Sequence, residues 1–485
     1  MKRAATIFIS AFITLSLGVT AFAQGYDIST DDITINQDGS YEITGTSSEH
    51  KIFVVGANAV ITLENVDITT NNKSAIDIDD NSDVQLIISG TNNLTVTGYG
   101  TTAGIHVSGG SLTISGTDSD DDILTVLNTG SEGAAIGSSY DENFTGTITV
   151  DSGVTVNAGS ENGGAEGAGI GSGYASDMIG EITINDGSVV NAFSQQDGAG
   201  IGSGQYGSMS GTITINGGEV NAQSIEYGAG IGAGDYGGVS GTITINDGNV
   251  YAYSDYGGAG IGSGDYGDMS GIITINGGNI TAIANDDGAG IGCGDYNMTG
   301  EIIINGGNVT AVSNGCEVGV GAGYDGYVNG DITIHGDAVI TLGDDDVIGS
   351  MYESAGTIYL YKGAEINGIT VTDIDDLKEA GILNDNMKVE LLEEEESGTS
   401  YSLDKLNTVS KIKAAKAGDT VYVYESELSK GKLPYYVLEA LAKTDNVTLI
   451  VVSDSGETAE IKSSSVPEKG KNAFFTVDEL LDMTK

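Results

Sequence analysis

The sequence predicts an all-β fold: a right-handed parallel β-helix with about 30 residues and three short strands per turn, followed by a small α+β module. The first observation is a phrase of the type Gly-Ala-Gly-Ile-Gly, which returns at intervals of 28 to 34 residues. The second is that no run within a repeat has helical periodicity, which argues against leucine-rich and helical repeats. A fixed period of this length is typical of a solenoid, in which each turn buries its apolar face only against its neighbours. The aliphatic residues that mark the repeats are Ile76, Ile105, Ile136, Ile170, Ile201, Ile231, Ile261, Ile291, Val320 and Ile348.

One repeat, residues 229–258, shows the three predicted strands. Residues 229–234, 242–246 and 249–254 are short runs with a period of two, separated by Gly, Asn, Asp and Ser residues. Stacked turns of a β-helix lie about 4.8 Å apart, so side chains at equivalent positions should form columns along the axis. The positions that we expect to point inward are Ile231, Ile243, Ile245, Val250 and Ala252.

The chain divides into four predicted segments. Residues 1–23 resemble a secretory signal peptide, with basic Lys2 and Arg3, an apolar stretch and an Ala-Phe-Ala cleavage site. Residues 24–75 are expected to be atypical capping turns, and residues 76–372 the regular β-helix. In residues 373–485 glycine becomes sparse and lysine returns, which predicts a small α+β module. We expect its strands at 420–424 and 447–453 and its helices at 435–443 and 477–483.

The charge of the chain argues against several classes of function. The formal net charge is −51, and no Lys or Arg occurs between Ser74 and Tyr361. Such a polyanion repels nucleic acid and anionic membranes, and no apolar run is long enough to insert into a membrane. A lyase needs a cationic base, and the repeats offer only His106 and His335. We therefore expect a protein without catalytic residues, although paired carboxylates leave a polysaccharide hydrolase or lyase as a minor alternative.

Aspartates in equivalent positions suggest bound calcium. Asp235, Asp265 and Asp295 occupy the same position in three successive repeats, so their carboxylates should lie about 5 Å apart. Carboxylates at that distance repel one another, and Ca²⁺ between them would remove the repulsion. The alternative is a solvated acidic surface that keeps a repetitive sheet soluble. Further candidate ligands lie in acidic turns, at Asp77, Asp79, Asp344 and Asp346.

A column of tyrosines beside these aspartates suggests a carbohydrate platform. A tyrosine recurs four or five residues after most of the markers, in Gly- and Asp-rich turns. We expect Tyr206, Tyr236, Tyr266 and Tyr296 to offer ring faces to pyranose rings, with the aspartates binding hydroxyl groups. Gly230 and Gly232 would add a bare outward strip for a flat polymer. The alternative is a purely structural ladder of stacked rings.

The cysteines are uninformative about pairing. Cys293 and Cys316 lie in successive repeats but at different positions, so both a disulfide and two buried thiols are open.

Two regions carry a resemblance to a known family. Residues 41–45, 59–68 and 74–78 resemble the opening turns of the secreted carbohydrate-binding β-helix family of clostridia. The Gly-Ala-Gly-Ile-Gly repeats are similar to those of Firmicutes surface proteins. The resemblance implies calcium-dependent, non-catalytic binding of plant-wall polysaccharides such as cellulose or polygalacturonate, and it transfers no individual ligand residue.

These observations favour a secreted, monomeric, calcium-assisted polysaccharide-binding protein that is extracellular or attached to the bacterial surface. A structural or adhesive surface rod is the alternative. An ice-binding face at Thr212, Thr214, Thr242 and Thr244 is a weaker hypothesis, because Glu181, Ile272, Glu301, Ile303 and Asp331 interrupt it.

Overall fold

The computed structural model describes residues 23–117, 121–160 and 166–393 of the chain, and parts of the segment that follows. Those parts are residues 420–424, 432–434, 438, 441–442, 446–453, 458–466, 474–476 and 480. The predicted signal peptide lies outside the described residues, apart from residue 23.

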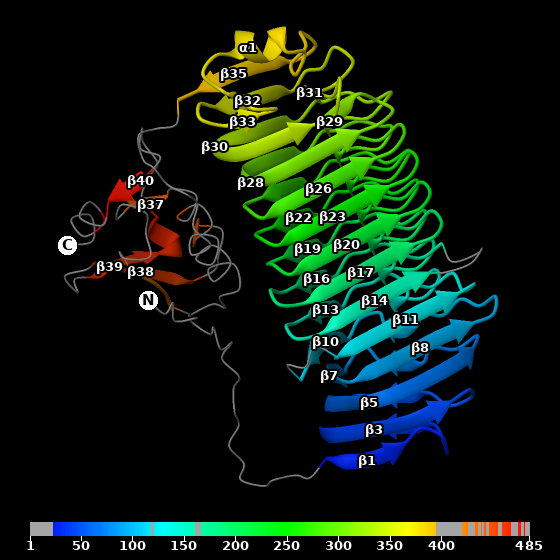
Figure 1. Ribbon diagram of the computed structural model, residues 1–485. Helices are drawn as coiled ribbons and strands as arrows, with labels where there is room; N and C mark the ends of the chain where they lie inside the picture. The colour runs from blue at the N-terminus through cyan, green and yellow to red at the C-terminus, as the bar shows by residue number, and fades with distance from the viewer. Residues whose placement is uncertain are drawn as a thin grey trace, which may run out of the picture.

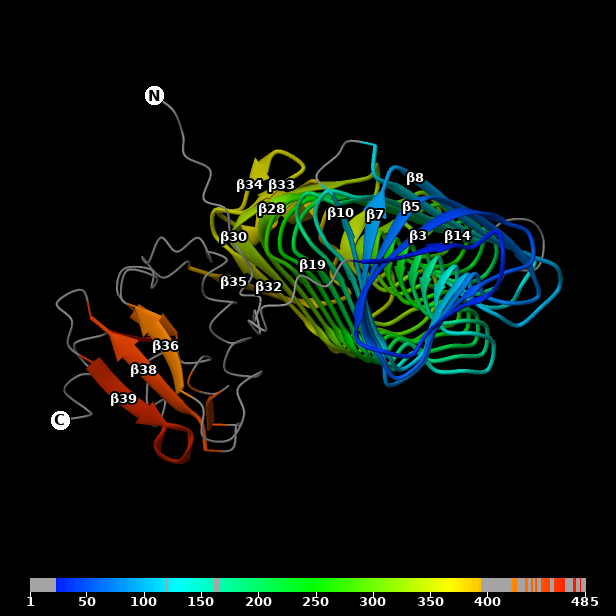
Figure 2. The ribbon, with the colours of Figure 1, turned by 90° about the horizontal axis from the view of Figure 1, so that it is seen from below.

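The described N-terminal part is a parallel β-helix whose turns climb from the N-terminal end (Figure 1). Each regular turn contributes one strand to a 12-stranded small sheet and two strands to a 23-stranded large sheet. The two strands of the large sheet form separate columns, which we call the first and the second strand column. Seen from below, the strands of successive turns lie over one another (Figure 2). This arrangement confirms the predicted fold class.

The strands are short and evenly distributed. The small sheet contains β2 (Ile33–Ile35), β4 (Ile52–Val54), β6 (Ile76–Ile78), β9 (Ile105–Val107), β12 (Ile136–Gly137), β15 (Ile170–Gly171), β18 (Ile201–Gly202), β21 (Ile231–Gly232), β24 (Ile261–Gly262), β27 (Ile291–Gly292), β29 (Val318–Gly321) and β31 (Val347–Gly349). The first column contains β1 (Gln24–Asp27), β3 (Gly39–Ser47), β5 (Asn58–Asn71), β7 (Asp83–Ser89), β10 (Ser111–Gly116), β13 (Thr147–Val150), β16 (Glu181–Ile184), β19 (Thr212–Ile215), β22 (Thr242–Ile245), β25 (Ile272–Ile275), β28 (Glu301–Ser313), β30 (Asp331–Leu342), β32 (Thr357–Tyr361) and β35 (Lys388–Leu392). The second column contains β8 (Thr91–Thr97), β11 (Ile123–Thr129), β14 (Thr155–Ser160), β17 (Val189–Ser194), β20 (Glu219–Ser224), β23 (Asn249–Ser254), β26 (Asn279–Ala284), the second halves of β5, β28 and β30, and the short hairpin β33 (Glu365–Ile366) and β34 (Ile369–Thr370).

The turns stack in register. Ile201, Ile231, Ile261 and Ile291 are direct partners in the small sheet. The inward positions predicted from the repeat are all buried, with at most 2% exposed surface. The alternating period of two is therefore satisfied on every strand of the turn, because one face of each strand contributes to a single continuous core.

The glycines of the repeat correct one expectation. Gly230 and Gly232 are buried and form no outward strip. A Cβ added at Gly230 would lie 2.4 Å from the backbone nitrogen of Tyr253, and one at Gly232, where φ is +140°, would lie 1.8 Å from the carbonyl oxygen of Gly262. Glycine recurs here because Gly230 lies against the backbone of the second column and Gly232 against the backbone of the next turn of the small sheet.

The C-terminal end of the rod extends beyond the predicted boundary at residue 372. Strand β35 pairs in parallel with β32, so the large sheet continues to Leu392. The helix α1 (Ile374–Glu379) is capped by Asp373, whose side chain accepts a hydrogen bond from the backbone nitrogen of Asp375. Leu377 of this helix packs in the core of the rod. The change in composition at 373 marks a capped end, where lysine and helix formers cover the last turn, rather than the start of a new domain.

The described parts of the C-terminal module have their own core, which includes Val423, Leu449, Leu438 and Leu480. Strands β36 (Thr420–Tyr424) and β38 (Thr448–Val452) lie where we predicted strands, with β39 (Thr458–Lys462) beside β38. A short 3₁₀ turn, η3 (Ser463–Ser465), follows, and β37 (Lys432–Pro434) pairs with β40 (Phe474–Thr476). The predicted helices fall largely outside the described residues. Cys293 and Cys316 are both buried free thiols.

Candidate functional site

The tyrosines lie on a loop that joins the small sheet to the first column in each regular turn. A buried residue anchors the loop: Val239 forms parallel bridges to Met209 and Met269, and all three side chains are fully buried. A buried serine braces it, since the Oγ of Ser203 donates to the carbonyl of Gly207 at 2.6 Å. The loops are therefore held at a constant position along the rod.

Six tyrosines of successive turns form a continuous column of rings. The ring centroids of Tyr206, Tyr236 and Tyr266 lie 5.1 Å apart, with interplanar angles of 18° and 13°. Tyr140 and Tyr174 stack in the same way at 5.4 Å, but Tyr174 meets Tyr206 edge to face. Tyr296 continues the column at 5.7 Å and a tilt of 60°. The predicted alignment of the tyrosines is thus present.

The stacking changes what the column offers to a ligand. Because the rings of Tyr206, Tyr236 and Tyr266 cover one another's faces, their edges and hydroxyl groups meet solvent, and about half of each residue is exposed. All three residues have φ between +55° and +61°, a left-handed conformation that is unfavourable for a large side chain. Because strained backbone positions are often found at functional sites, the column of tyrosines is a candidate binding feature and not only a stabilising stack of rings.

The aspartates beside the tyrosines are buried in the loop. Asp235 and Asp265 are only 5% and 6% exposed, whereas Asp295 is partly exposed. The Oδ2 atom of Asp235 accepts a hydrogen bond from Gln205 at 2.9 Å, while its Oδ1 atom is buried without a partner within the described residues. Burial, reinforced by Asp235, Asp295 and nearby Asp287, raises the pKa of Asp265 to about 7.

Asp197 is a residue that the sequence analysis missed. The backbone nitrogen of Asp235 donates to its carbonyl oxygen at 2.8 Å, which brings the two carboxyl groups to the same corner. Burial, followed by the charge of Asp235, raises the pKa of Asp197 to about 7, and its Oδ1 atom is also buried and unpartnered within the described residues. Equivalent positions hold Glu166 in the preceding turn and Tyr227 and Gly257 in the next two, and aspartate returns only at Asp287, so no column appeared in the sequence.

The predicted metal ligands differ in their suitability. Among the described residues, no group of three or more His, Cys, Asp or Glu side chains is arranged to hold a metal ion. Asp77 is already paired with Lys51 and His106, and Asp79 accepts hydrogen bonds from Gly56 and Ser82. Asp346 accepts from two backbone nitrogens, and its buried Oδ1 atom has no partner within the described residues, while Asp344 is exposed. Asp197 and Asp235, at one corner, each have a buried Oδ1 atom without a partner in the described part of the chain.

The histidines of the rod are engaged in structural contacts. His106 lies between Asp77, 2.9 Å from its Nδ1 atom, and Glu142, 2.8 Å from its Nε2 atom. Burial opposes protonation, but hydrogen bonds to these two carboxylates outweigh it and raise the pKa of His106 to about 9. His335 stacks on Tyr361 with ring centroids 4.3 Å apart.

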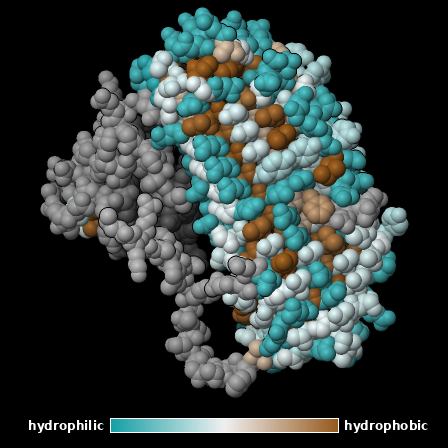
Figure 3. Space-filling view, in the orientation of Figure 1, coloured by the Kyte–Doolittle hydropathy of each residue, from teal (hydrophilic) through white to brown (hydrophobic). Residues whose placement is uncertain are grey.

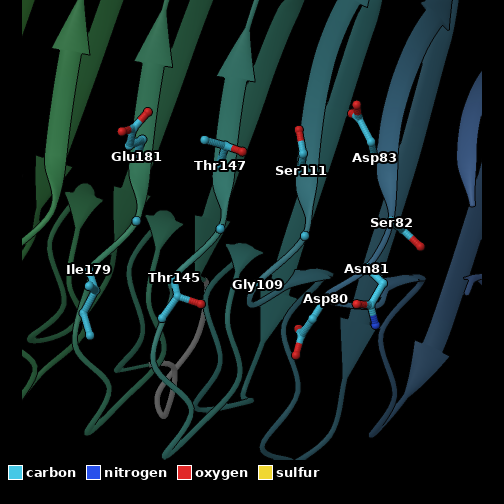
Figure 4. Close-up of a pocket in the computed structure, with 13 residues that line it drawn as sticks. Asp80, Asn81, Ser82, Asp83, Gly109, Ser111, Thr145, Thr147, Ile179 and Glu181 are labelled. Carbon is cyan, nitrogen blue, oxygen red and sulfur yellow. The ribbon is translucent and has the colours of Figure 1, made fainter. Parts of the chain in front are cut away.

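A groove crosses four turns near the N-terminal end of the rod. It has a volume of about 550 Å³ and follows the corner where the small sheet leads into the first column. Asp83, Ser111, Thr147 and Glu181 form one row at the starts of β7, β10, β13 and β16, and Asp80, Asn81, Thr145 and Ile179 come from the corners below them (Figure 4). The groove forms here because the chain turns through Gly109 and Gly110 without the longer tyrosine loop. No cationic side chain lines it.

Comparison with known proteins supports the fold and leaves the ligand open. Five segments match a family model described as a β-helix repeat, at residues 182–205, 213–235, 243–265, 273–295 and 302–326. The match agrees with the parallel β-helix fold of the structure. No curated protein and no solved structure matches it. No helix of the described part is long and apolar enough to cross a membrane.

Proposed function

We propose that this β-helix is a secreted, non-catalytic polysaccharide-binding protein that acts outside the cell or on its surface. The observation that carries the proposal is the groove over four turns, which is lined along the rod axis by hydroxyl and carboxylate groups and one amide. Four turns span about 15 Å at the usual strand spacing, which suits a short stretch of an extended glycan. The tyrosine column adds further hydroxyl groups.

The charge of the rod selects among glycans. With no Lys or Arg between residues 74 and 361, a neutral polymer meets no electrostatic barrier, whereas a polyuronate is repelled. Binding of an acidic glycan would require a bridging cation. Asp197 and Asp235 would hold Ca²⁺, which would supply positive charge at a surface that has none of its own.

The positions of the histidines argue against catalysis by a histidine, while the carboxylates that line the groove, Asp80, Asp83 and Glu181, keep a hydrolase as the minor alternative. A histidine that acts as general acid or base must lie beside the substrate. Neither His106 nor His335 lines the groove, and both are held by other side chains.

Affinity gel electrophoresis tests the proposal with the polymers hydroxyethyl cellulose, xyloglucan, galactomannan and polygalacturonate. We expect retardation by at least one uncharged polymer, and retardation by polygalacturonate only with calcium and not with a chelator. A chain that migrates unchanged through every polymer, with and without calcium, would support the structural or adhesive rod instead.

A further inference from the structure

The second strand column presents two uncharged rows of outward residues on a strongly acidic chain. Strands β14, β17, β20 and β23 pair in register, so their outward residues form three rows along the axis. The row at the strand starts, Thr155, Val189, Glu219 and Asn249, contains the exposed Glu219. The other two rows are uncharged: Asn157, Asn191, Asn221 and Tyr251, and Gly159, Phe193, Gln223 and Tyr253. Neutral and apolar residues run along the front of the rod over the large sheet, with more hydrophilic residues at the margins (Figure 3).

A hollow of about 150 Å³ opens in this face. One wall is Phe193, whose ring lies over Gly159: a Cβ added there would lie 2.1 Å from the ring. Because the position in the preceding turn is glycine, the ring leans over it and leaves space beside Gln223. The residues that line the hollow are Asn191, Ala192, Phe193, Gln195, Asn221, Gln223 and Ile225.

Two side-chain amides at the hollow form fewer hydrogen bonds than the corresponding asparagines of the first column. In the first column, Asn216, Asn246, Asn276 and Asn305 each donate to the asparagine of the preceding turn at 2.7 to 2.9 Å. In the second column this ladder stops after Asn191, which donates to Asn157. Asn221 instead accepts from Gln223 of its own strand at 2.7 Å. Within the described residues, the Asn221 amide nitrogen and the Asn191 amide oxygen therefore form no hydrogen bond.

We propose that this hollow is a subsite for one uncharged pyranose ring of a bound glycan, an assignment that rests on the proposed function. An apolar ring beside unengaged amide donors and acceptors matches a sugar, which has C–H faces and a rim of hydroxyl groups. The volume equals the space of about five water molecules, enough for one ring. The parallel rings of Tyr251 and Tyr253 in the next turn, 6.2 Å apart, extend the surface along the axis.

Other occupants fit the hollow less well. An anionic ligand would be repelled by the net charge of −51, and a cation would favour the carboxylates of the loops. An apolar protein segment would bury the Asn191 amide oxygen and the Asn221 amide nitrogen without giving them hydrogen-bond partners, which costs free energy. The chemistry of the face therefore selects a neutral sugar.

The test compares variants of the full chain for retardation by hydroxyethyl cellulose, xyloglucan and galactomannan. Phe193→Ala removes the apolar wall, and Asn221→Asp introduces a charge with little change in size. We expect each to weaken binding at least tenfold for the polymer that retards the wild type. The matched control is Ile283→Ala, which truncates an outward residue of the same row two turns beyond the hollow and should bind like the wild type.

Each outcome decides the assignment, provided that far-ultraviolet circular dichroism shows the variants folded. If Phe193→Ala fails to fold, Asn221→Asp alone decides it. Wild-type affinity in the folded variants would overturn the subsite but leave the proposed function standing. A wild-type chain that binds no uncharged polymer would overturn both. Equal loss in Ile283→Ala would show that the whole face, and not the hollow, is responsible, and would also overturn the subsite.

Discussion

Two carboxyl groups of the loops, the half-buried Asp197 and the buried Asp265, make the stability of the rod depend on pH. In an unfolded chain such groups ionise near pH 4, whereas in the folded rod their pKa values are about 7. The folded state therefore binds extra protons between these values. The contribution of these two groups to the free energy of unfolding should fall as the pH rises from about 4 to about 7, and stay constant above that.

We predict that Asp265→Asn stabilises the protein at pH 8, by on the order of 2 kcal/mol, and by less than half as much at pH 5. The control is Asp268→Asn, which removes the same charge from an exposed position in the same loop. Thermal unfolding at both pH values measures the effect. A wild-type stability that is constant or rises between pH 5 and pH 8 would contradict this account of the buried carboxylates.

The same residues show the limit of sequence reasoning at this scale. The repeat placed Asp235 and Asp265 at one position, and the structure confirms their alignment. In two earlier turns, Tyr140 and Tyr174 occupy the backbone position that the aspartates occupy later. The reason is that one residue fewer precedes the tyrosine in those loops. This offset explains the edge-to-face contact between Tyr174 and Tyr206. Ring orientation and the burial of a carboxylate depend on such offsets, which a repeat period does not contain.

At the scale of the element, the closely packed glycines are the positions where substitution should be least tolerated. We predict that Gly232→Ala destabilises the rod by at least about 3 kcal/mol or prevents folding, because the new Cβ collides with the carbonyl of Gly262 at a positive φ. Gly306→Ala, whose Cβ would lie 3.2 Å or more from its nearest neighbours, should cost no more than about 1 kcal/mol. Thermal unfolding followed by circular dichroism compares the two, and similar melting temperatures would argue against the close approach of the backbones.

The contact of His106 with Asp77 and Glu142 joins strands β6 and β9 to the first tyrosine loop. The pKa of His106 is raised to about 9, so its contribution to stability is complete below about pH 6.5 and is lost as the pH rises through 9. We predict that His106→Ala lowers stability by about 2 kcal/mol at pH 6 and by much less at pH 10. Melting temperatures of both proteins at the two pH values test this. A deficit that is equal or larger at pH 10 would show that the loss arises from packing and not from charge.

The elements themselves were predictable where the period of two was strict. The strands β21, β22 and β23 lie within the three runs of the repeat. Because each turn has a single core, the alternation of apolar and polar residues determines which side chains point inward. The outward glycine strip was wrong because sequence alternation does not show how closely two backbones approach. Aligning the third strand of each repeat would have placed Phe193 and Gln223 in one row. The residue type in that row varies from turn to turn, so nothing in the sequence distinguishes it from other exposed positions.

At the scale of the whole molecule, stacking in register converts a sequence repeat into columns that run the length of the rod. Aligned side chains concentrate negative charge at the loop corners and leave two outward rows of the second column, at turns β14 to β23, uncharged. The proposed cation site and the proposed sugar subsite therefore lie on different parts of the rod. The period predicted the columns, but their distribution around the circumference required the structure.

The measurement that tests this account most directly is the affinity of the chain for uncharged β-1,4-linked glucose oligomers of two to six units, obtained by isothermal titration calorimetry. Binding along the axis predicts an affinity that rises with each added unit and levels out at about three or four units, since four turns span about 15 Å. An affinity that does not change with length would contradict binding along the columns, and no measurable heat at any length, together with no retardation by the longer polymers, would contradict glycan binding itself.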